Sequence, residues 1–113
     1  MLAGFAVVPL GVADGVKELV AEALKIVDAS GLDYELGAMG TTVEGEREQV
    51  MEVILACHER VLELAPRVLT NITLDERRGA TGRLEGKVRD VEEILGKRLR
   101  RKSGAPPGGA AKK

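Results

Sequence analysis

The first thirty residues combine a continuous apolar run with a segment of helical periodicity. Residues 2–9 (LAGFAVVP) are apolar throughout, and a run of this length with adjacent valines is typical of a strand buried on both faces. The next segment has Asp14 as a candidate N-cap and ends at Ser30-Gly31. Its apolar stripe consists of Val16, Leu19, Val20, Ala23, Leu24 and Val27. The pattern predicts a buried strand followed by an amphipathic helix that lies on a sheet.

Short extended pieces follow, and then a second helix. Residues 33–36 and 41–44 each suit a short strand, and the connection 37–40 (GAMG) is rich in turn residues. A helix is expected from about Glu46 to Pro66, with the stripe Val50, Val53, Ile54, Cys57, Val61 and Leu64. The pattern therefore predicts a β-hairpin that leads into a second helix.

The last strand alternates strictly. In residues 67–75 (RVLTNITLD), Val68, Thr70, Ile72 and Leu74 share one side, whereas Leu69, Asn71, Thr73 and Asp75 share the other. A loop at 77–82 and a third helix from 86 to about 99 complete the prediction.

The order strand, helix, strand, strand, helix, strand is that of an α+β, ferredoxin-like βαββαβ sandwich, here with an extra C-terminal helix. Right-handed crossovers place the first and third strands in the centre of an antiparallel sheet, with both main helices on one face. Because the first strand is apolar on both faces, the second sheet face needs a cover. We therefore expect a homo-oligomer in which another subunit covers it, although the C-terminal helix could cover part of the same surface.

Length and charge divide the chain into a folded body and a tail. The 113 residues suffice for one core, which we expect in residues 1–99. Residues 97–113 carry seven basic residues and no acidic one, whereas residues 1–96 carry ten basic and eighteen acidic residues, a formal charge of −8. Residues 100–113 are expected to be a disordered basic tail, although such a tail can also dock on the body, a partner or RNA.

No apolar run approaches the roughly 20 residues of a membrane helix, so no membrane partner is expected and the expected location is cytoplasmic.

Catalytic and nucleic-acid-binding signals are weak. The only histidine, His58, follows the only cysteine, Cys57, within the second helix, where neighbours point about 100° apart and cannot form a catalytic pair. The glycine-rich stretch 37–45 lacks the lysine of a phosphate-binding loop. Nucleic-acid binding is unlikely because the body is acidic and has only two aromatic residues, Phe5 and Tyr34. We expect no enzymatic activity, no metal and no cofactor.

Polar side chains gather on the sheet face opposite the helices. Thr42 and Glu44 share one side of their strand, and Asn71 and Thr73 lie on the corresponding side of the last strand. Around an apolar central strand, these groups can form a pocket that recognises a small polar ring by hydrogen bonds. An ordinary polar surface, or hydrogen bonding between subunits, explains the same pattern.

Four stretches resemble the small thiamine-binding protein family, also known as domain of unknown function 77 or the MTH1187/YkoF-like group. They are MLAGFAVVPLGV, GLDYELGAMGTTVEGE, VMEVILACHERV and NITLDERRG, and the resemblance spans residues 1 to about 96. Its most specific part is Met39-Gly40-Thr41 followed by Glu44-Gly45. Ala38 departs from the proline expected before Met39, and the tail is not part of the resemblance.

The resemblance implies a ferredoxin-like fold, association into dimers and tetramers through the sheets, and non-catalytic binding of thiamine or its hydroxymethylpyrimidine moiety. Thiamine needs donors and acceptors for its aminopyrimidine, a tolerant environment for its cationic thiazolium, and a ring to stack on. The expected ligand-binding residues are Phe5, Thr41, Thr42, Glu44 and Asn71. Two alternatives remain: a structural or regulatory interaction module whose sheet face serves only oligomerisation, and a small enzyme for which Glu44 is the sole candidate acid or base.

Overall fold

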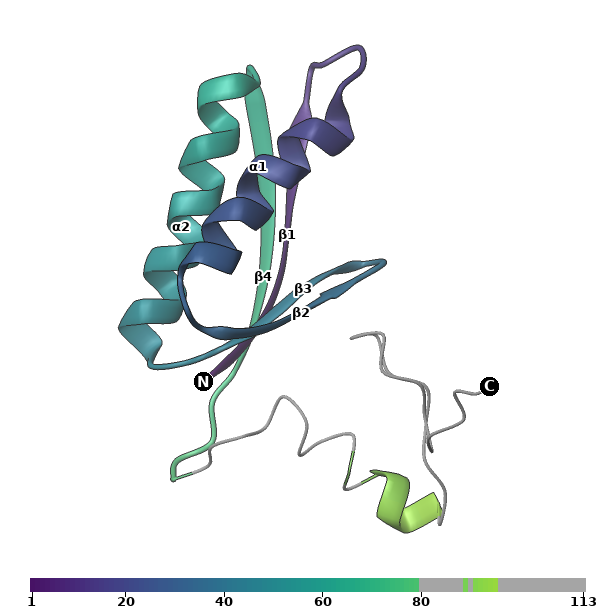
Figure 1. Ribbon diagram of the computed structural model, residues 1–113, viewed down its shortest axis with the longest axis vertical. Helices are drawn as coiled ribbons and strands as arrows, with labels where there is room; N and C mark the ends of the chain where they lie inside the picture. The colour runs from purple at the N-terminus through teal and green to yellow at the C-terminus, as the bar shows by residue number, and fades with distance from the viewer. Residues whose placement is uncertain (80–88, 90, 96–113) are drawn as a thin grey trace.

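A computed structural model of the chain describes residues 1–79, 89 and 91–95. Its elements form two layers, a four-stranded sheet and two helices on one of its faces (Figure 1). In chain order they are β1 (Leu2–Leu10), α1 (Val16–Ala29), β2 (Asp33–Gly37), β3 (Gly40–Glu44), α2 (Arg47–Leu64) and β4 (Arg67–Asp75).

The sheet has the strand order β2-β3-β1-β4, and all its pairs are antiparallel. This order confirms the ferredoxin-like fold, with the first and third strands in the centre. β1 pairs with its two neighbouring strands over very different lengths. Nine residues of β1 pair with β4, from Leu2↔Asp75 to Leu10↔Arg67, whereas only four pair with β3.

The core lies between the sheet and the helices. Alternate residues of β1, Ala3 and Phe5, point into it together with Val43 of β3, and the helices contribute Ile54, Val27 and other buried side chains. Full burial of a side chain such as Ile54 stabilises the fold by about 1.5–3 kcal/mol. The predicted apolar stripes of both helices therefore face the sheet, except at their ends, where Val16 and Leu64 are exposed.

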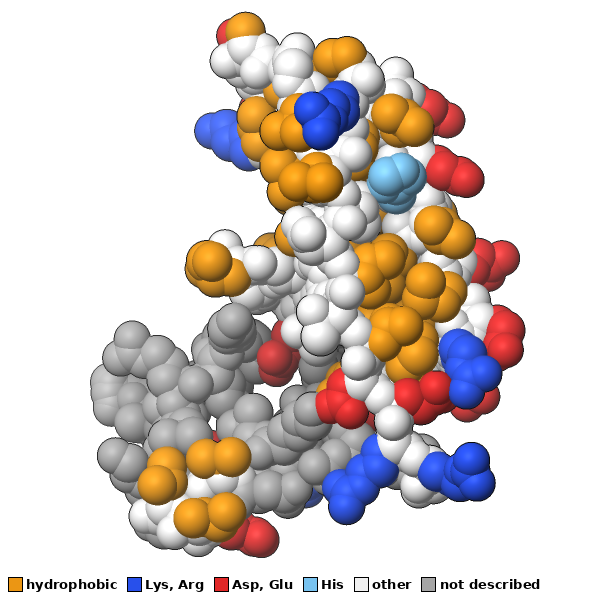
Figure 2. Space-filling model, turned by 180° about the vertical axis from the view of Figure 1, so that it is seen from behind, with side chains coloured by type: hydrophobic (Ala, Val, Ile, Leu, Met, Phe, Trp, Pro, Cys, Tyr) orange, Lys and Arg blue, Asp and Glu red, His pale blue; other side chains and the backbone are white. Residues whose placement is uncertain are grey.

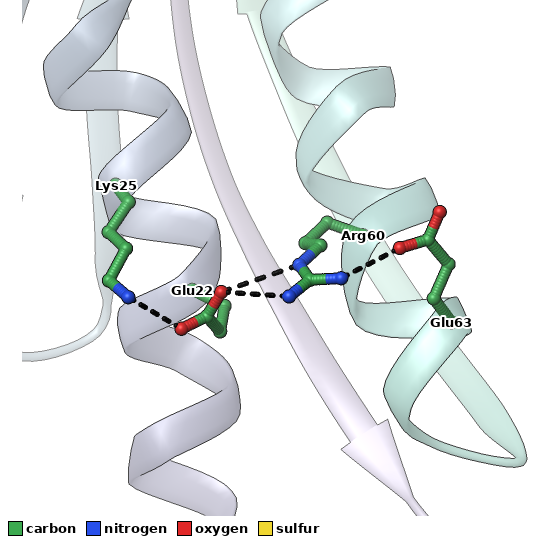
Figure 3. Close-up of polar contacts among 4 residues, drawn as sticks. All are labelled: Glu22, Lys25, Arg60 and Glu63. Atoms are coloured by element: carbon green, nitrogen blue, oxygen red, sulfur yellow. Dashed lines mark hydrogen bonds and ion pairs between the residues drawn. The ribbon is translucent and has the colours of Figure 1, made fainter.

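An ionic network joins the outer surfaces of the two helices (Figure 3). Arg60 of α2 lies 3.1 Å from Glu22 of α1 and 2.9 Å from Glu63, while Lys25 lies 2.7 Å from the other oxygen of Glu22. Hydrogen bonds from Lys25 and Arg60 lower the pKa of Glu22 below its usual value. Because these groups are solvated, the network aligns α1 with α2 more than it stabilises the fold.

Two local predictions need correction. Asp14 does not cap α1: the N-cap is Gly15, whose φ of 79° is left-handed, and no side-chain cap hydrogen bond is present. A glycine adopts this turn without the steric cost that the Cβ of aspartate brings.

The second correction concerns the end of the first strand: β1 continues past Pro9 to Leu10. Proline is tolerated there because β3 pairs with β1 only as far as Phe5, so the missing N–H interrupts no second ladder. The predicted end of α1 is confirmed: Ser30 Oγ donates to the Val27 carbonyl, and Gly31 has a φ of 80°.

The C-terminal predictions fall mainly outside the described residues. Of the helix expected from 86 to about 99, residues 91–95 are helical, and the tail 100–113 lies entirely outside the described part. None of the helices in the described part of the chain is long and apolar enough to cross a membrane.

Candidate functional site

The β2–β3 hairpin leaves the sheet before its own pairing ends. Its strands pair from Asp33↔Glu44 to Gly37↔Gly40, but β3 pairs with β1 only from Glu44 to Thr41, which lies opposite Phe5. Beyond this point the end of the hairpin projects away from β1 (Figure 1). The two cavities at the centre of the site lie on either side of this projecting end.

The first, which we call the open-face cavity, lies on the sheet face opposite the helices and measures about 260 Å³. Gly4 lies between Thr42 of β3 and Thr73 of β4, and Ala6 lies opposite Asn71. A Cβ built on Gly4 meets nothing within 4 Å, so the missing side chain leaves open space between the two threonines. Small residues on β1 and polar residues beside them thus form a shallow hollow lined by hydroxyls and a carboxamide.

The second, the α1-side cavity, lies between the hairpin end, β1 and α1 and measures about 360 Å³. Its walls are aliphatic or aromatic: Phe5, Val7, Val20, Ala23, Leu24 and Leu36. Met39 lines it too, although 87% of that residue is exposed, so it lies at the rim. Thr41 supplies the polar group of the lining, and the residue is only 5% exposed. Its hydroxyl makes no hydrogen bond within the described part of the chain.

The predicted ligand-binding residues divide between these cavities. Thr42 and Asn71 present their side chains on the open face, whereas Phe5 and Thr41 alternate to the helix side, where Phe5 is 6% exposed and belongs to the core cluster. Phe5 and Thr41 contribute to the linings of both cavities, because they lie at the point where β3 ends its pairing with β1 and the two cavities approach each other. Glu44 lines neither; it lies opposite Leu2 and Asp33 at the other end of β3.

Two parts of the cavity linings were not predicted from the sequence. The wall that α1 supplies through Val20, Ala23 and Leu24 carries no signal beyond a core stripe. Gly4 was detectable, since a glycine within a central strand marks a place where space is left for another group.

Cys57 and His58 are directed to different partners. The Cys57 Sγ–H donates to the Ala23 carbonyl, and burial raises the pKa of this thiol to about 11. His58 Nδ1 lies 2.7 Å from Thr70 Oγ1 on β4. Both contacts are structural, and no group of His, Cys, Asp and Glu among the described residues is arranged to hold a metal ion.

A third and larger hollow, about 490 Å³, is lined by charged residues at the beginning of α2 and the end of β4. Within it, Arg47 Nε and Nη2 both donate to Glu76 Oε1. This ion pair joins two of the charged residues of the hollow, and none of the predicted site residues lines it. In contrast, neither cavity beside the hairpin is lined by an ionisable side chain among the described residues.

The chain is similar to several proteins of one family. A sequence model described as thiamine-binding protein matches residues 3–92. UPF0045 protein MT1949 of Mycobacterium tuberculosis is 43% identical over 96 residues, which cover 84% of this chain and 94% of that protein.

Solved structures agree with the sequence comparison. The crystal structure of the hypothetical protein MJ1052 of Methanocaldococcus jannaschii superposes with a TM-score of 0.75 at 28% identity, covering 81% of this chain and 95% of that one. A Thermotoga maritima protein, provisionally described as acting in thiamine biosynthesis or salvage, has a TM-score of 0.70 at 30% identity, with coverages of 80% and 96%. Since the family match spans most of the described residues and the fold is shared, the chain belongs to the thiamine-binding protein family.

Proposed function

We propose that this chain binds thiamine or its hydroxymethylpyrimidine moiety, without transforming it, at the end of the β2–β3 hairpin. The observation that carries the proposal is the pair of cavities there, lined by neutral hydrogen-bonding groups and apolar side chains. A small-molecule site typically combines apolar walls with a few placed polar groups. The family match and the description of the Thermotoga maritima protein point to thiamine chemistry.

The polar groups suit the ligand. Thiamine presents ring-nitrogen acceptors, an amine donor and a hydroxyl, and the threonine hydroxyls and the Asn71 carboxamide can all both donate and accept. The thiazolium is a cation, and residues 1–96 carry a formal charge of −8 that favours it. Glu44 lies on the same face as Thr42, two residues along β3, and adds negative charge without lining the cavity.

A second copy of the chain is proposed to cover the open face. Val8 and Leu69, paired across β1 and β4, are exposed there. Figure 2 shows apolar side chains over the upper part of this face, with the polar and backbone atoms of the central part below them. Covering these side chains stabilises an assembly through the sheets, a dimer or tetramer, and turns the shallow open-face cavity into a site at the subunit interface.

The same linings support the proposal that binding occurs without catalysis. General acid–base or nucleophilic chemistry needs a titratable or activated group within hydrogen-bond reach of the substrate. The hydroxyls and the carboxamide of the two cavities recognise a ligand without moving its protons. We also propose a cytoplasmic location, where the single thiol Cys57 stays reduced.

Isothermal titration calorimetry with thiamine tests the proposal. Asn71→Ala should weaken binding by about tenfold, because a hydrogen bond to a charged or polar ligand contributes about 1.4 kcal/mol. Thr70→Ala is the matched control: Thr70 is the neighbour of Asn71 on β4, but it points to the helix side and contacts His58. Absence of any heat with wild-type protein at millimolar thiamine would sink the proposal.

The alternative is an interaction module whose open face serves only oligomerisation. Size-exclusion chromatography of the same variants separates the two functions. Under the alternative, Asn71→Ala disperses the oligomer and thiamine gives no heat with any variant; under the proposed function, the oligomer persists and only the affinity falls.

A further inference from the structure

We propose that the two cavities divide the ligand: the neutral pyrimidine ring enters the α1-side cavity, while the thiazolium half stays on the open face. This inference rests on the proposed function and assigns the two halves of the ligand within it. Thiamine consists of two rings joined by a single methylene group, and two cavities of about 360 and 260 Å³ lie side by side at the hairpin end, where the same residues line both.

The charge of each ring determines which of the two cavities it occupies. The α1-side cavity is walled mainly by aliphatic side chains of α1, β1 and β2, and no ionisable side chain of the described residues lines it. A fixed cation placed there loses its hydration without gaining a counter-ion, which is strongly unfavourable. A neutral aminopyrimidine has no such penalty and buries its ring faces against apolar groups.

The polar atoms of the α1-side cavity match a neutral heteroaromatic ring. Thr41 brings a hydroxyl that is buried and has no partner in the described part of the chain, and such a group is costly unless a ligand or water satisfies it. In addition, β1 has no strand partner on its β3 side beyond Phe5 within the described residues, although it stays paired with β4 on the other side, so main-chain groups on the β3 side can pair with a ring edge. Phe5 supplies an aromatic wall.

The open face suits the cationic half. Thr42, Thr73 and Asn71 offer neutral oxygens that can accept from the hydroxyethyl group or solvate the charge. Glu44 and Asp75 both lie opposite Leu2 on this face, one on each side of β1. Both positions lie on the open face, and neither residue lines the apolar cavity behind it.

One ligand can reach both cavities because they share the same strand end. Five residues line both of them: Phe5, Ala6, Met39, Gly40 and Thr41. The methylene bridge of thiamine would cross beside Met39, whose flexible and exposed side chain adapts to irregular apolar surfaces.

Two ligands and two sets of variants test this division by calorimetry. Thr41→Val is nearly isosteric and removes the buried hydroxyl, and Val20→Phe fills the α1-side cavity from α1. Both should weaken thiamine and free hydroxymethylpyrimidine alike, by about tenfold for the lost hydrogen bond. Thr73→Val, the matched change on the open face, should weaken thiamine by about fivefold and leave hydroxymethylpyrimidine within about twofold.

Circular dichroism and size-exclusion chromatography establish that each variant folds and assembles. If Val20→Phe fails to fold, Thr41→Val alone still tests the role of the α1-side cavity. The division is overturned if Thr73→Val weakens hydroxymethylpyrimidine as much as thiamine while Thr41→Val changes neither affinity. In that case thiamine binding itself still stands. If wild-type protein binds neither ligand, the proposed function fails together with the inference, so the two failures are distinguishable.

Discussion

Replacing Gly40 by alanine probes the point at which the hairpin leaves the sheet. Gly40 has a φ of 151°, and a Cβ built on it would lie 2.9 Å from the Phe5 carbonyl oxygen. The oxygen belongs to the backbone of the central strand and cannot rotate away. Alanine therefore has to adopt a strained φ and also push the hairpin end away from β1.

The two penalties can be separated by a control. Backbone strain of this kind costs about 1–3 kcal/mol, and a steric overlap in a packed region costs about another 1–3 kcal/mol. Gly31→Ala carries the strain without the overlap, because Gly31 has a φ of 80° and nothing lies within 4 Å of its Cβ position. The entropy that alanine removes from the unfolded chain is the same in both variants and cancels. We expect Gly40→Ala to lower the free energy of unfolding by about 2 kcal/mol more than Gly31→Ala.

Urea unfolding followed by far-ultraviolet circular dichroism, at one protein concentration for all variants, measures this difference. Thiamine affinity should fall at least tenfold in Gly40→Ala and stay unchanged in Gly31→Ala, because only the first change displaces the strand end that both cavities share. Equal destabilisation by the two substitutions would refute the role assigned to the Phe5–Gly40 approach.

Three further predictions concern other parts of the chain. Cys57, whose pKa burial raises to about 11, should react with iodoacetamide at pH 8 at least a hundredfold more slowly in native protein than in urea, as mass spectrometry can follow; equal rates would contradict its burial. Glu22→Gln should lower the melting temperature slightly at pH 7, and because the pKa of Glu22 is lowered in the folded state, this difference should vanish as the pH falls through that pKa; a difference that grows in acid would contradict the ion network. Deleting residues 100–113 should leave thiamine affinity unchanged by calorimetry, whereas a loss of affinity would favour the interaction-module alternative.

The architecture was predictable because its signals are long and mutually consistent. The apolar run of β1, the stripes of both helices and the alternation of β4 each specify one buried face, and the handedness of crossovers then leaves one strand order. The cap of α1 was not predictable at this level. Asp14 and Gly15 are both acceptable caps, and the choice depends on the path by which the preceding loop reaches the helix.

The site was predictable only in part. Alternation places Thr42 and Asn71 on one face of the sheet, as the structure shows. The expected site also included Phe5 and Thr41, which the same alternation turns toward the helices. That they line a separate cavity depends on where β3 parts from β1 and on the distance between the hairpin and α1. Those quantities follow from sheet twist and helix packing, and residue patterns do not encode them.

The unequal pairing of β1 also governs how the molecule opens. From Gly37 to Gly40 the hairpin pairs only within its own short ladder, while β1 remains anchored to β4 along nine residues. Fraying of the hairpin end breaks few hydrogen bonds and exposes little of the core, so it belongs to the low-energy class of local openings. Under the proposed function, ligand enters and leaves by such fluctuations at a rate independent of global unfolding, and amide hydrogen exchange would record bound ligand as protection confined to the hairpin.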